Sequence, residues 1–196
     1  MPVEPAEGEH PMLELRNLSV GADNEGVHRD ILKNVNLRVD EVELPGGHTS
    51  IREVVEHPGG VCIAALTDRK ELLFVRQYRY PYGEVLLELP AGKLEYGEEP
   101  LPAGKRELKE ETGATAKEYI DLGKLYPSPG YCGEIIHMYM ATGLTFGEAS
   151  PDEDEFLELE RIPLEQAAQM VLDNRIPDAK TQAAVLKVYM KVKAGV

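Results

Sequence analysis

The sequence predicts an α+β fold, a mixed α/β/α sandwich preceded by an N-terminal β-hairpin subdomain. Apolar and β-branched runs bounded by turn residues recur along most of the chain, which is typical of strands. One segment near the middle has helix formers and a terminal glycine, and two amphipathic segments close the chain. Strands around a central helix, followed by further helices, fit a sheet with helices on both faces.

The composition favours a protein without a nucleic-acid or membrane partner. The formal net charge is −14, whereas a nucleic-acid-binding surface needs a basic patch to displace counterions. The sequence contains no signal peptide and no long apolar run. Cys62 and Cys132 are its only cysteines, so we expect a soluble protein in the reducing cytoplasm, with no disulfide.

The chain divides into three predicted regions. Residues 1–11 are rich in proline and glutamate and are expected to form a disordered tail. Residues 12–56 are expected to form a strand and hairpin region, in which Pro45-Gly46-Gly47 makes the turn. The remaining residues, 57–196, form the main domain.

Within the main domain, apolar runs and turn residues locate the elements. The run 61–66 is almost wholly apolar and is typical of a strand buried on both faces. Other strands are expected at 72–77, 85–89, 119–126, 134–141 and 156–159, and helices at 164–174 and 178–192.

The stretch 92–114, GKLEYGEEPLPAGKRELKEETGA, holds the densest set of candidate catalytic side chains. Its second half is helical in pattern and ends at Gly113. At 3.6 residues per turn, Glu107, Glu110 and Glu111 share one helix face. Like charges so close repel one another unless a cation lies between them, and oxygen ligands suit Mg²⁺ or Mn²⁺. The alternative is an acidic helix end that faces solvent.

Two residues are unusual for the start of this helix. Pro102 is tolerable in a first turn, but Gly104 costs about 1 kcal/mol relative to alanine in a helix interior. Because nothing in the sequence compensates for Gly104, we expect the helix to begin late or to fray at its start.

The same stretch resembles the Nudix box, in which a glycine, a glutamate and an Arg-Glu-apolar-any-Glu-Glu-any-Gly-apolar run stand at fixed spacing. The matching positions are Gly92, Glu98, Arg106, Glu107, Leu108, Glu110, Glu111, Gly113 and Ala114. The segments ELPAGKLEYGEE, VRQYRYPYGE, YPSPGYCGEIIHMY and PDEDEF extend the resemblance to the ADP-ribose pyrophosphatase branch of the Nudix hydrolases.

The resemblance implies a metal site. The carbonyl of Ala91 and the carboxylates of Glu107 and Glu111 would bind Mg²⁺ or Mn²⁺ directly, with Glu110 binding directly or through water. About two or three ions are expected, as in other phosphoryl-transfer sites that use several metals. Arg106 would orient the glutamates by charge-assisted hydrogen bonds.

The resemblance also implies contacts to a nucleotide-sugar substrate. Arg79 and Arg52 would hold its phosphates or its adenosine end, and Glu134 would lie beside the ribose or the metals. Ser128 and Gly130 flank the proline that marks ADP-ribose hydrolases within this branch. In relatives the N-terminal hairpin is exchanged between subunits, so a homodimer is expected, in which Arg52 serves the partner's site.

The activity that the resemblance implies is hydrolysis of the pyrophosphate bond of ADP-ribose to AMP and ribose 5-phosphate. Glu153, in an acidic run, would be the general base, with Glu155 as the other candidate. Two alternatives stay open: hydrolysis of GDP-mannose or another nucleoside diphosphate sugar, and a non-catalytic module that senses ADP-ribose.

Overall fold

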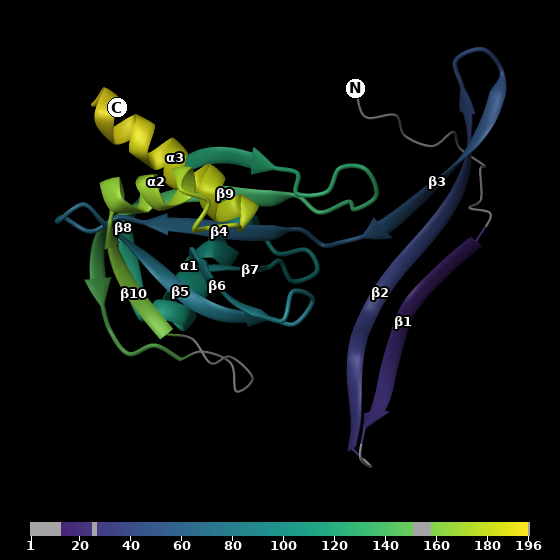
Figure 1. Cartoon of the computed structure of the whole chain (residues 1–196), viewed down its shortest axis with the longest axis horizontal. Helices are drawn as coiled ribbons and strands as arrows, with labels where there is room; N and C mark the ends of the chain where they lie inside the picture. Colours follow the sequence, from purple (N-terminus) through teal and green to yellow (C-terminus); the bar gives the residue numbers. More distant parts are fainter. Residues whose placement is uncertain (1–12, 25–26, 151–157, 196) are drawn as a thin grey trace. The chain divides into compact units, whose positions relative to one another are not determined.

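The computed structural model describes residues 13–24, 27–150 and 158–195, with side chains for 36–150 and 158–195. The chain forms two compact units, Met1–His57 with Ser128–Glu134, and Pro58–Pro127 with Ile135–Val196. The elements are β1 Leu13–Asn24, β2 Val27–Leu44, β3 His48–Glu56, β4 Gly60–Ala65, β5 Glu71–Arg79, β6 Glu84–Glu88, β7 Ala91–Lys93, α1 Pro100–Thr112, β8 Ala114–Leu125, β9 Ile136–Phe146, β10 Glu158–Pro163, α2 Leu164–Leu172 and α3 Ala179–Ala194 (Figure 1).

The first unit contains a three-stranded antiparallel sheet in the order β1-β2-β3. Val42 on β2 pairs with Ser50 on β3, and the turn between these strands holds Gly46 and Gly47 at φ 107° and 79°. Glycine adopts such angles without the strain that a Cβ would cause. The predicted hairpin is therefore confirmed, whereas the pairing of β1 with β2 was not predicted. The tail predicted for residues 1–11 lies outside the described residues.

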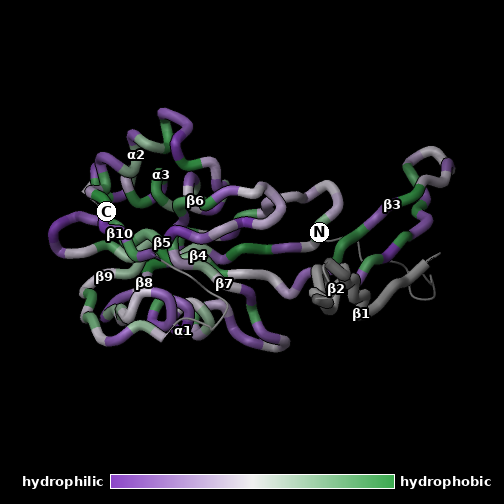
Figure 2. Tube along the Cα trace, turned by 60° about the horizontal axis from the view of Figure 1, so that its bottom comes forward, coloured by the Kyte–Doolittle hydropathy of each residue, from purple (hydrophilic) through white to green (hydrophobic). Residues whose placement is uncertain are grey.

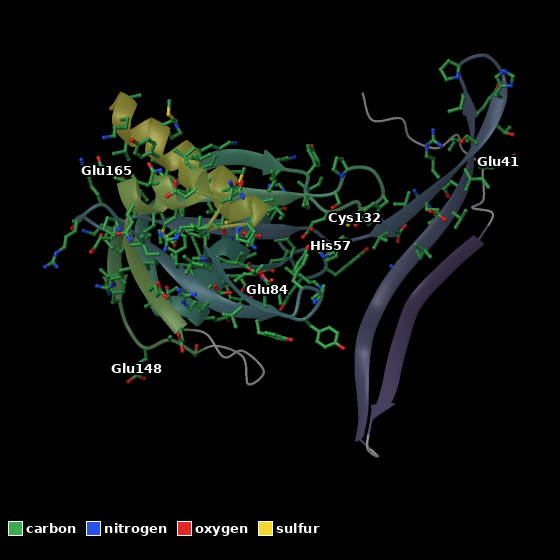
Figure 3. The ribbon with its side chains drawn as sticks, in the orientation of Figure 1. Glu41, His57, Glu84, Cys132, Glu148 and Glu165 are labelled. Atoms are coloured by element: carbon green, nitrogen blue, oxygen red, sulfur yellow. The ribbon has the colours of Figure 1, made fainter. Side chains whose placement is uncertain are left out.

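Residues 128–134 belong to the first unit because they pair with the end of β3. The backbone N–H of Val55 donates to the carbonyl of Tyr131 at 2.7 Å, and its carbonyl accepts from Gly133 at 2.9 Å. Val55 and Cys132 form an isolated parallel bridge, and Cys132 is labelled in Figure 3. The segment between the strands predicted at 119–126 and 134–141 is thus part of the hairpin unit.

The second unit is built on two sheets. The larger has the order β7-β4-β9-β8, with β4 parallel to β9 and the other pairs antiparallel, and the smaller is antiparallel with the order β10-β5-β6. Helix α1 contacts β4, β7 and β8, while α3 contacts β4, β8 and β9 and packs against α2. The fold is the predicted α+β sandwich with a mixed sheet.

Strand β4 forms the centre of the second unit, and all of its residues are buried, as predicted. Cys62 and Ala64 pack with the buried residues of α2 and α3, and Val61 and Ile63 pack with those of α1. Apolar residues therefore run along the whole strand (Figure 2). Because side chains alternate between the two faces of a strand, β4 joins one core on the α1 side to another on the α3 side.

Helix α1 begins and ends at residues suited to those positions. Pro100 is the first helical residue, where its fixed φ and missing N–H cost nothing. Gly113 follows the last residue with φ 67° and donates its N–H to the carbonyl of Lys109 at 2.8 Å. The predicted helix end is confirmed.

The expectation that Gly104 delays or frays the helix is wrong. The helix is continuous through this position, and Gly104 is buried against β4. A Cβ at Gly104 would lie 2.6 Å from Cδ1 of Ile63 and 2.9 Å from Cγ2 of Val61. The glycine lets the helix lie close to the strand, so the packing offsets its poor helix propensity.

Helices α2 and α3 lie close to their predicted positions. Asp178 is the N-cap of α3, and its carboxylate accepts a hydrogen bond from the backbone N–H of Thr181 at 3.0 Å. Among the helices that the structure describes, none is long and apolar enough to cross a membrane.

Candidate active site

The Glu107 side chain of α1 packs directly against the backbone of β7. A Cβ built at Gly92 would lie 2.1 Å from both Cδ and Oε1 of Glu107, far inside van der Waals contact. The Glu107 side chain is only 13% exposed. Position 92 therefore needs glycine because the carboxylate occupies the space of a side chain there.

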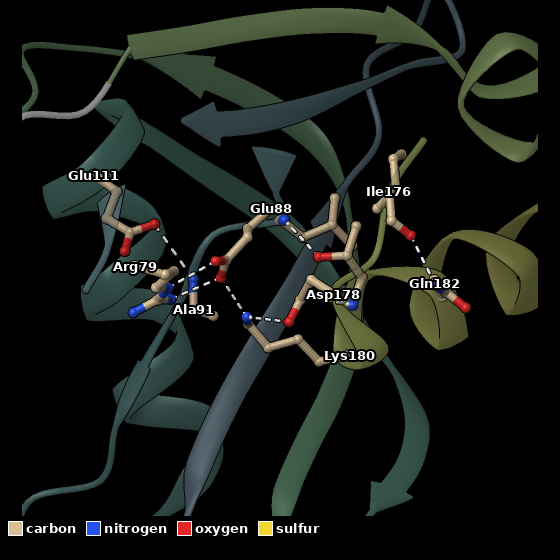
Figure 4. A network of polar contacts seen from close by, with 10 residues as sticks. Arg79, Glu88, Ala91, Glu111, Ile176, Asp178, Lys180 and Gln182 are labelled. Carbon is tan, nitrogen blue, oxygen red and sulfur yellow. Dashed lines mark hydrogen bonds and ion pairs between the residues drawn. The ribbon is translucent and has the colours of Figure 1, made fainter. Parts of the chain in front are cut away.

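Glu111, one turn further along α1, reaches the neighbouring residue of β7. It is 5% exposed, and its Oε2 accepts a hydrogen bond from the backbone N–H of Ala91 at 3.3 Å (Figure 4). Residues separated by four positions share one helix face, so α1 brings both carboxylates to Ala91 and Gly92. Sequence spacing predicted the shared face, and the structure adds the strand that the face meets.

Arg106 binds three of the box carboxylates. Its Nε and Nη2 donate to Glu98 at 3.2 and 3.1 Å, while Nη1 donates to Glu107 at 2.9 Å and to Glu110 at 3.0 Å. The hydrogen bonds to Glu98 are the main reason that the pKa of Arg106 is raised, and they lower the pKa of Glu98. The guanidinium thus holds three like charges together in fixed positions.

A pocket of about 380 Å³ lies beside this cluster. That volume falls within the usual range for small-molecule sites. Four of the predicted site residues in the box or next to it line this pocket, and so does Arg79 at the end of β5. The lining residues are Gln77, Arg79, Ala91, Gly92, Lys93, Glu95, Arg106, Glu107 and Glu110.

The oxygen atoms that α1 and β7 bring together suit a hard divalent cation. The carboxylates of Glu107 and Glu111 meet the backbone of Ala91 and Gly92, and Mg²⁺ and Mn²⁺ prefer such oxygen ligands. In the part of the chain that the structure describes, no group of three or more His, Cys, Asp or Glu side chains is arranged to hold a metal as it stands. The predicted ligands are nevertheless of the chemical type that binds such a metal. In this structure Glu107 accepts a hydrogen bond from Arg106.

Cys62, on β4, pairs with Ala91 of β7 and so lies next to the predicted metal ligands. Burial raises the pKa of its thiol to about 12. A thiol that stays protonated at neutral pH is a poor nucleophile, so this cysteine serves in packing.

Four predicted substrate-binding residues lie in the first unit. Arg52, on β3, donates from Nη1 to Ser50 and to the carbonyl of Ile51. Glu134 lies 3.7 Å from Nδ1 of His57. The carbonyl of Ser128 accepts hydrogen bonds from Tyr131 and Cys132, and Gly130 is exposed within that turn. Their roles toward a substrate stay predictions.

The two candidate general bases, Glu153 and Glu155, lie outside the described residues. Their assignment therefore rests on the sequence resemblance.

Sequence reasoning missed an ionic network beside the pocket. Glu88 is 1% exposed and contacts both Arg79 and Lys180, and Lys180 also contacts Asp178 (Figure 4). The one available signal was a glutamate within the apolar run 85–89, because a charge among buried residues requires partners. The sequence offered no means of identifying Lys180 as that partner.

Replacing Gly92 by alanine is expected to lower kcat about 10- to 100-fold, the range seen when metal ligands lose their positioning. The new Cβ would displace the Glu107 carboxylate, which is the flexible end of a side chain, so the protein should still fold. Steady-state kinetics and thermal unfolding measure the two effects. Gly147→Ala is the control, because its Cβ would meet only the Gly113 carbonyl at 3.8 Å. Equal activity of both variants would contradict this account of Gly92.

Comparison with protein families identifies the domain. The NUDIX domain family matches residues 56–185, which include β4 to β10 and the whole of α1. The match covers the second unit as far as residue 185, together with residues 56–57 and 128–134 of the first.

Curated relatives are similar to this protein over most of its sequence. It is 44% identical over 161 residues to an ADP-ribose pyrophosphatase of Bacillus subtilis, covering 81% of this chain and 87% of the relative. It is 47% identical over 153 residues to a methanol dehydrogenase activator of Bacillus methanolicus, covering 77% and 83%. A GDP-mannose pyrophosphatase of Yersinia enterocolitica is 34% identical over 142 residues, covering 67% and 73%.

A solved structure shares the fold. The crystal structure of an ADP compounds hydrolase superposes with a TM-score of 0.73 at 25% sequence identity, covering 90% of this chain and 95% of that chain. Together with the family match and the box on α1, this likeness shows that the chain belongs to the Nudix hydrolase family.

Proposed function

We propose that this Nudix hydrolase cleaves the pyrophosphate bond of ADP-ribose, giving AMP and ribose 5-phosphate. The observation that carries the proposal is the meeting of Glu107 and Glu111 at Ala91 and Gly92 of β7, beside a pocket that Arg79 also lines. The 44% identity to a relative named as an ADP-ribose pyrophosphatase supports the choice of substrate.

We propose Mg²⁺ or Mn²⁺ as the cofactor, in about two or three ions, as multi-metal phosphoryl-transfer sites use. Glu107, Glu111 and the Ala91 carbonyl would hold the ions, with Glu110 reaching them directly or through water. When bound, the ions neutralise the diphosphate and lower the pKa of water.

The protein's own residues would divide the remaining work. Glu153, or else Glu155, accepts a proton from the attacking water while the water oxygen forms a bond to one phosphorus. The bond from that phosphorus to the bridging oxygen breaks, and the bridging oxygen leaves with the other phosphate. Arg79 contributes donors to the phosphates from the pocket wall, and Arg106 keeps the glutamates oriented.

The principal alternative substrate is a different nucleoside diphosphate sugar, and the relative named as a GDP-mannose pyrophosphatase supports it. A panel of ADP-ribose, ADP-glucose, GDP-mannose and UDP-glucose with Mg²⁺, assayed for the released nucleoside monophosphate, tests the choice. We expect the highest kcat/KM for ADP-ribose. A higher kcat/KM for GDP-mannose would replace ADP-ribose as the proposed substrate.

The relative from Bacillus methanolicus supports a second role, activation of a dehydrogenase. Assaying a methanol dehydrogenase with and without the protein tests that role. An unchanged dehydrogenase rate would count against it.

We also propose a cytoplasmic homodimer that exchanges the N-terminal hairpins. The free thiols of Cys62 and Cys132 are consistent with a reducing compartment. Light scattering coupled to size-exclusion chromatography tests the assembly. A measured mass equal to that of a single chain would rule out the proposal that Arg52 serves the site of a partner subunit.

A further inference from the structure

Glu88 is a nearly inaccessible carboxylate that contacts two cations from different elements. From β5, Arg79 donates Nε to Oε1 and Nη2 to Oε2, both at 2.7 Å. From the first turn of α3, Lys180 donates to Oε2 and also to Asp178 at 3.0 Å. Figure 4 shows the four side chains in this chain of contacts.

Arg79, Glu88 and Lys180 favour one another's charged forms. Burial alone would raise the pKa of Glu88, but hydrogen bonds and charges from Arg79 and Lys180 outweigh it, so the pKa is lowered. Burial alone would lower the pKa of Lys180, yet Asp178 and Glu88 raise it. Two positive and two negative side chains thus balance, as buried charges require.

The network also fixes α3 to the turn that precedes β7. Asp178 caps α3 by accepting from the N–H of Thr181, and Oγ1 of Thr181 accepts from the N–H of Leu89 at 2.9 Å. Leu89 directly follows Glu88 and is separated from Ala91, the first residue of β7, by Pro90 alone. The first turn of α3 is therefore joined to the link between β6 and β7, and β7 lines the pocket with Ala91, Gly92 and Lys93.

Arg79 connects this network to the pocket. Its Nε and Nη2 are both bound to Glu88, and among the described residues no partner binds Nη1. The side chain is 35% exposed and lines the pocket with Ala91 and Glu107. Because a bidentate pair fixes the plane of a guanidinium, Glu88 leaves Nη1 as the end available to a ligand.

We propose that Glu88 and Lys180 are positioning residues, which hold the Arg79 guanidinium in the pocket wall so that Nη1 meets a phosphate of the substrate. The inference rests on the proposed function, because it takes the ligand to be a diphosphate. An arginine held in place before binding loses less rotamer freedom when the phosphate arrives. A purely structural ion pair would stabilise the fold without affecting the affinity for substrate.

Glu88→Gln is the first test, since it keeps the shape and removes the charge that orients Arg79. We expect KM for ADP-ribose to rise about tenfold, the scale of immobilising one flexible side chain, with kcat changed less than about threefold. Lys180→Met leaves Arg79 paired and is expected to raise KM by about threefold. Lys193→Met is the matched control on α3, because Lys193 pairs with the exposed Glu165, and its KM should equal that of the wild type.

A double-mutant cycle separates positioning from folding. If Glu88 acts through Arg79, adding Glu88→Gln to Arg79→Ala should raise KM no further. Equal increases in both backgrounds, or a lower melting temperature with unchanged KM, would overturn the inference. If Glu88→Gln fails to fold, Lys180→Met takes its place in the same cycle.

The proposed hydrolysis and the positioning of Arg79 are tested separately by the dissociation constant of α,β-methylene-ADP-ribose, measured by calorimetry with Mg²⁺. This probe cannot be hydrolysed at its bridge, so its affinity reports positioning even if the wild type does not turn over ADP-ribose. Absence of turnover would overturn the proposed function. A probe affinity that Glu88→Gln leaves unchanged would overturn the inference about Arg79.

Discussion

Replacing Glu111 by glutamine is expected to lower kcat at least about 100-fold. Loss of a residue that only positions a metal ligand costs about 10- to 100-fold, so loss of a direct ligand should cost no less. Glutamine keeps an oxygen that can accept from the N–H of Ala91, so the local contact survives without the charge. Removing one of several crowded carboxylates should also leave the melting temperature equal or slightly higher.

The control for this prediction is Glu118→Gln, an exposed glutamate on β8 of the same unit. Activity is measured over rising Mg²⁺ concentration, together with thermal unfolding. We expect the Glu111 variant to need more Mg²⁺ for half-maximal activity, and the Glu118 variant to match the wild type. Near-normal turnover of Glu111→Gln at limiting Mg²⁺ would refute its assignment as a metal ligand.

Replacing Glu153 by glutamine is expected to lower kcat about 100- to 10,000-fold, the usual contribution of a general base. Glutamine cannot accept the proton of the attacking water. The acidic limb of the pH–rate profile, where the wild-type base becomes protonated and activity falls, should disappear in this variant. Stopped-time assays from about pH 5 to pH 9 would measure both effects.

Glu155→Gln is the matched comparison, because both residues belong to the same acidic run. We expect it to lower kcat much less and to keep the acidic limb. If Glu155→Gln is the more damaging change, the two assignments are exchanged. If both variants retain wild-type kcat, the base lies elsewhere in the chain.

Local patterns in the sequence predicted most of the second unit. Strand β4 is an apolar run, and α1 ends just before Gly113, as helix-end rules require. The spacing of Glu107 and Glu111 predicted their shared helix face, and the structure brings that face to Ala91 and Gly92. Such features depend on residues close together in the sequence, which is why pattern and spacing reveal them.

Features that depend on distant residues could not be predicted. Gly104 looked unfavourable because its benefit is close packing against β4, which a helix propensity does not contain. Residues 128–134 pair with the end of β3, about which their own composition says nothing. Glu88 and Lys180 meet across 92 positions in the sequence, so a buried charge was visible but its partner was not.

Product analysis of the wild-type reaction shows directly whether the protein hydrolyses the pyrophosphate bond of ADP-ribose. The protein is incubated with ADP-ribose and Mg²⁺, and the products are separated by ion-exchange chromatography. We expect AMP and ribose 5-phosphate in equal amounts, because water cleaves the bridge between the two phosphorus atoms. Release of ADP with free ribose, or tight binding of ADP-ribose without any product, would contradict the proposed reaction.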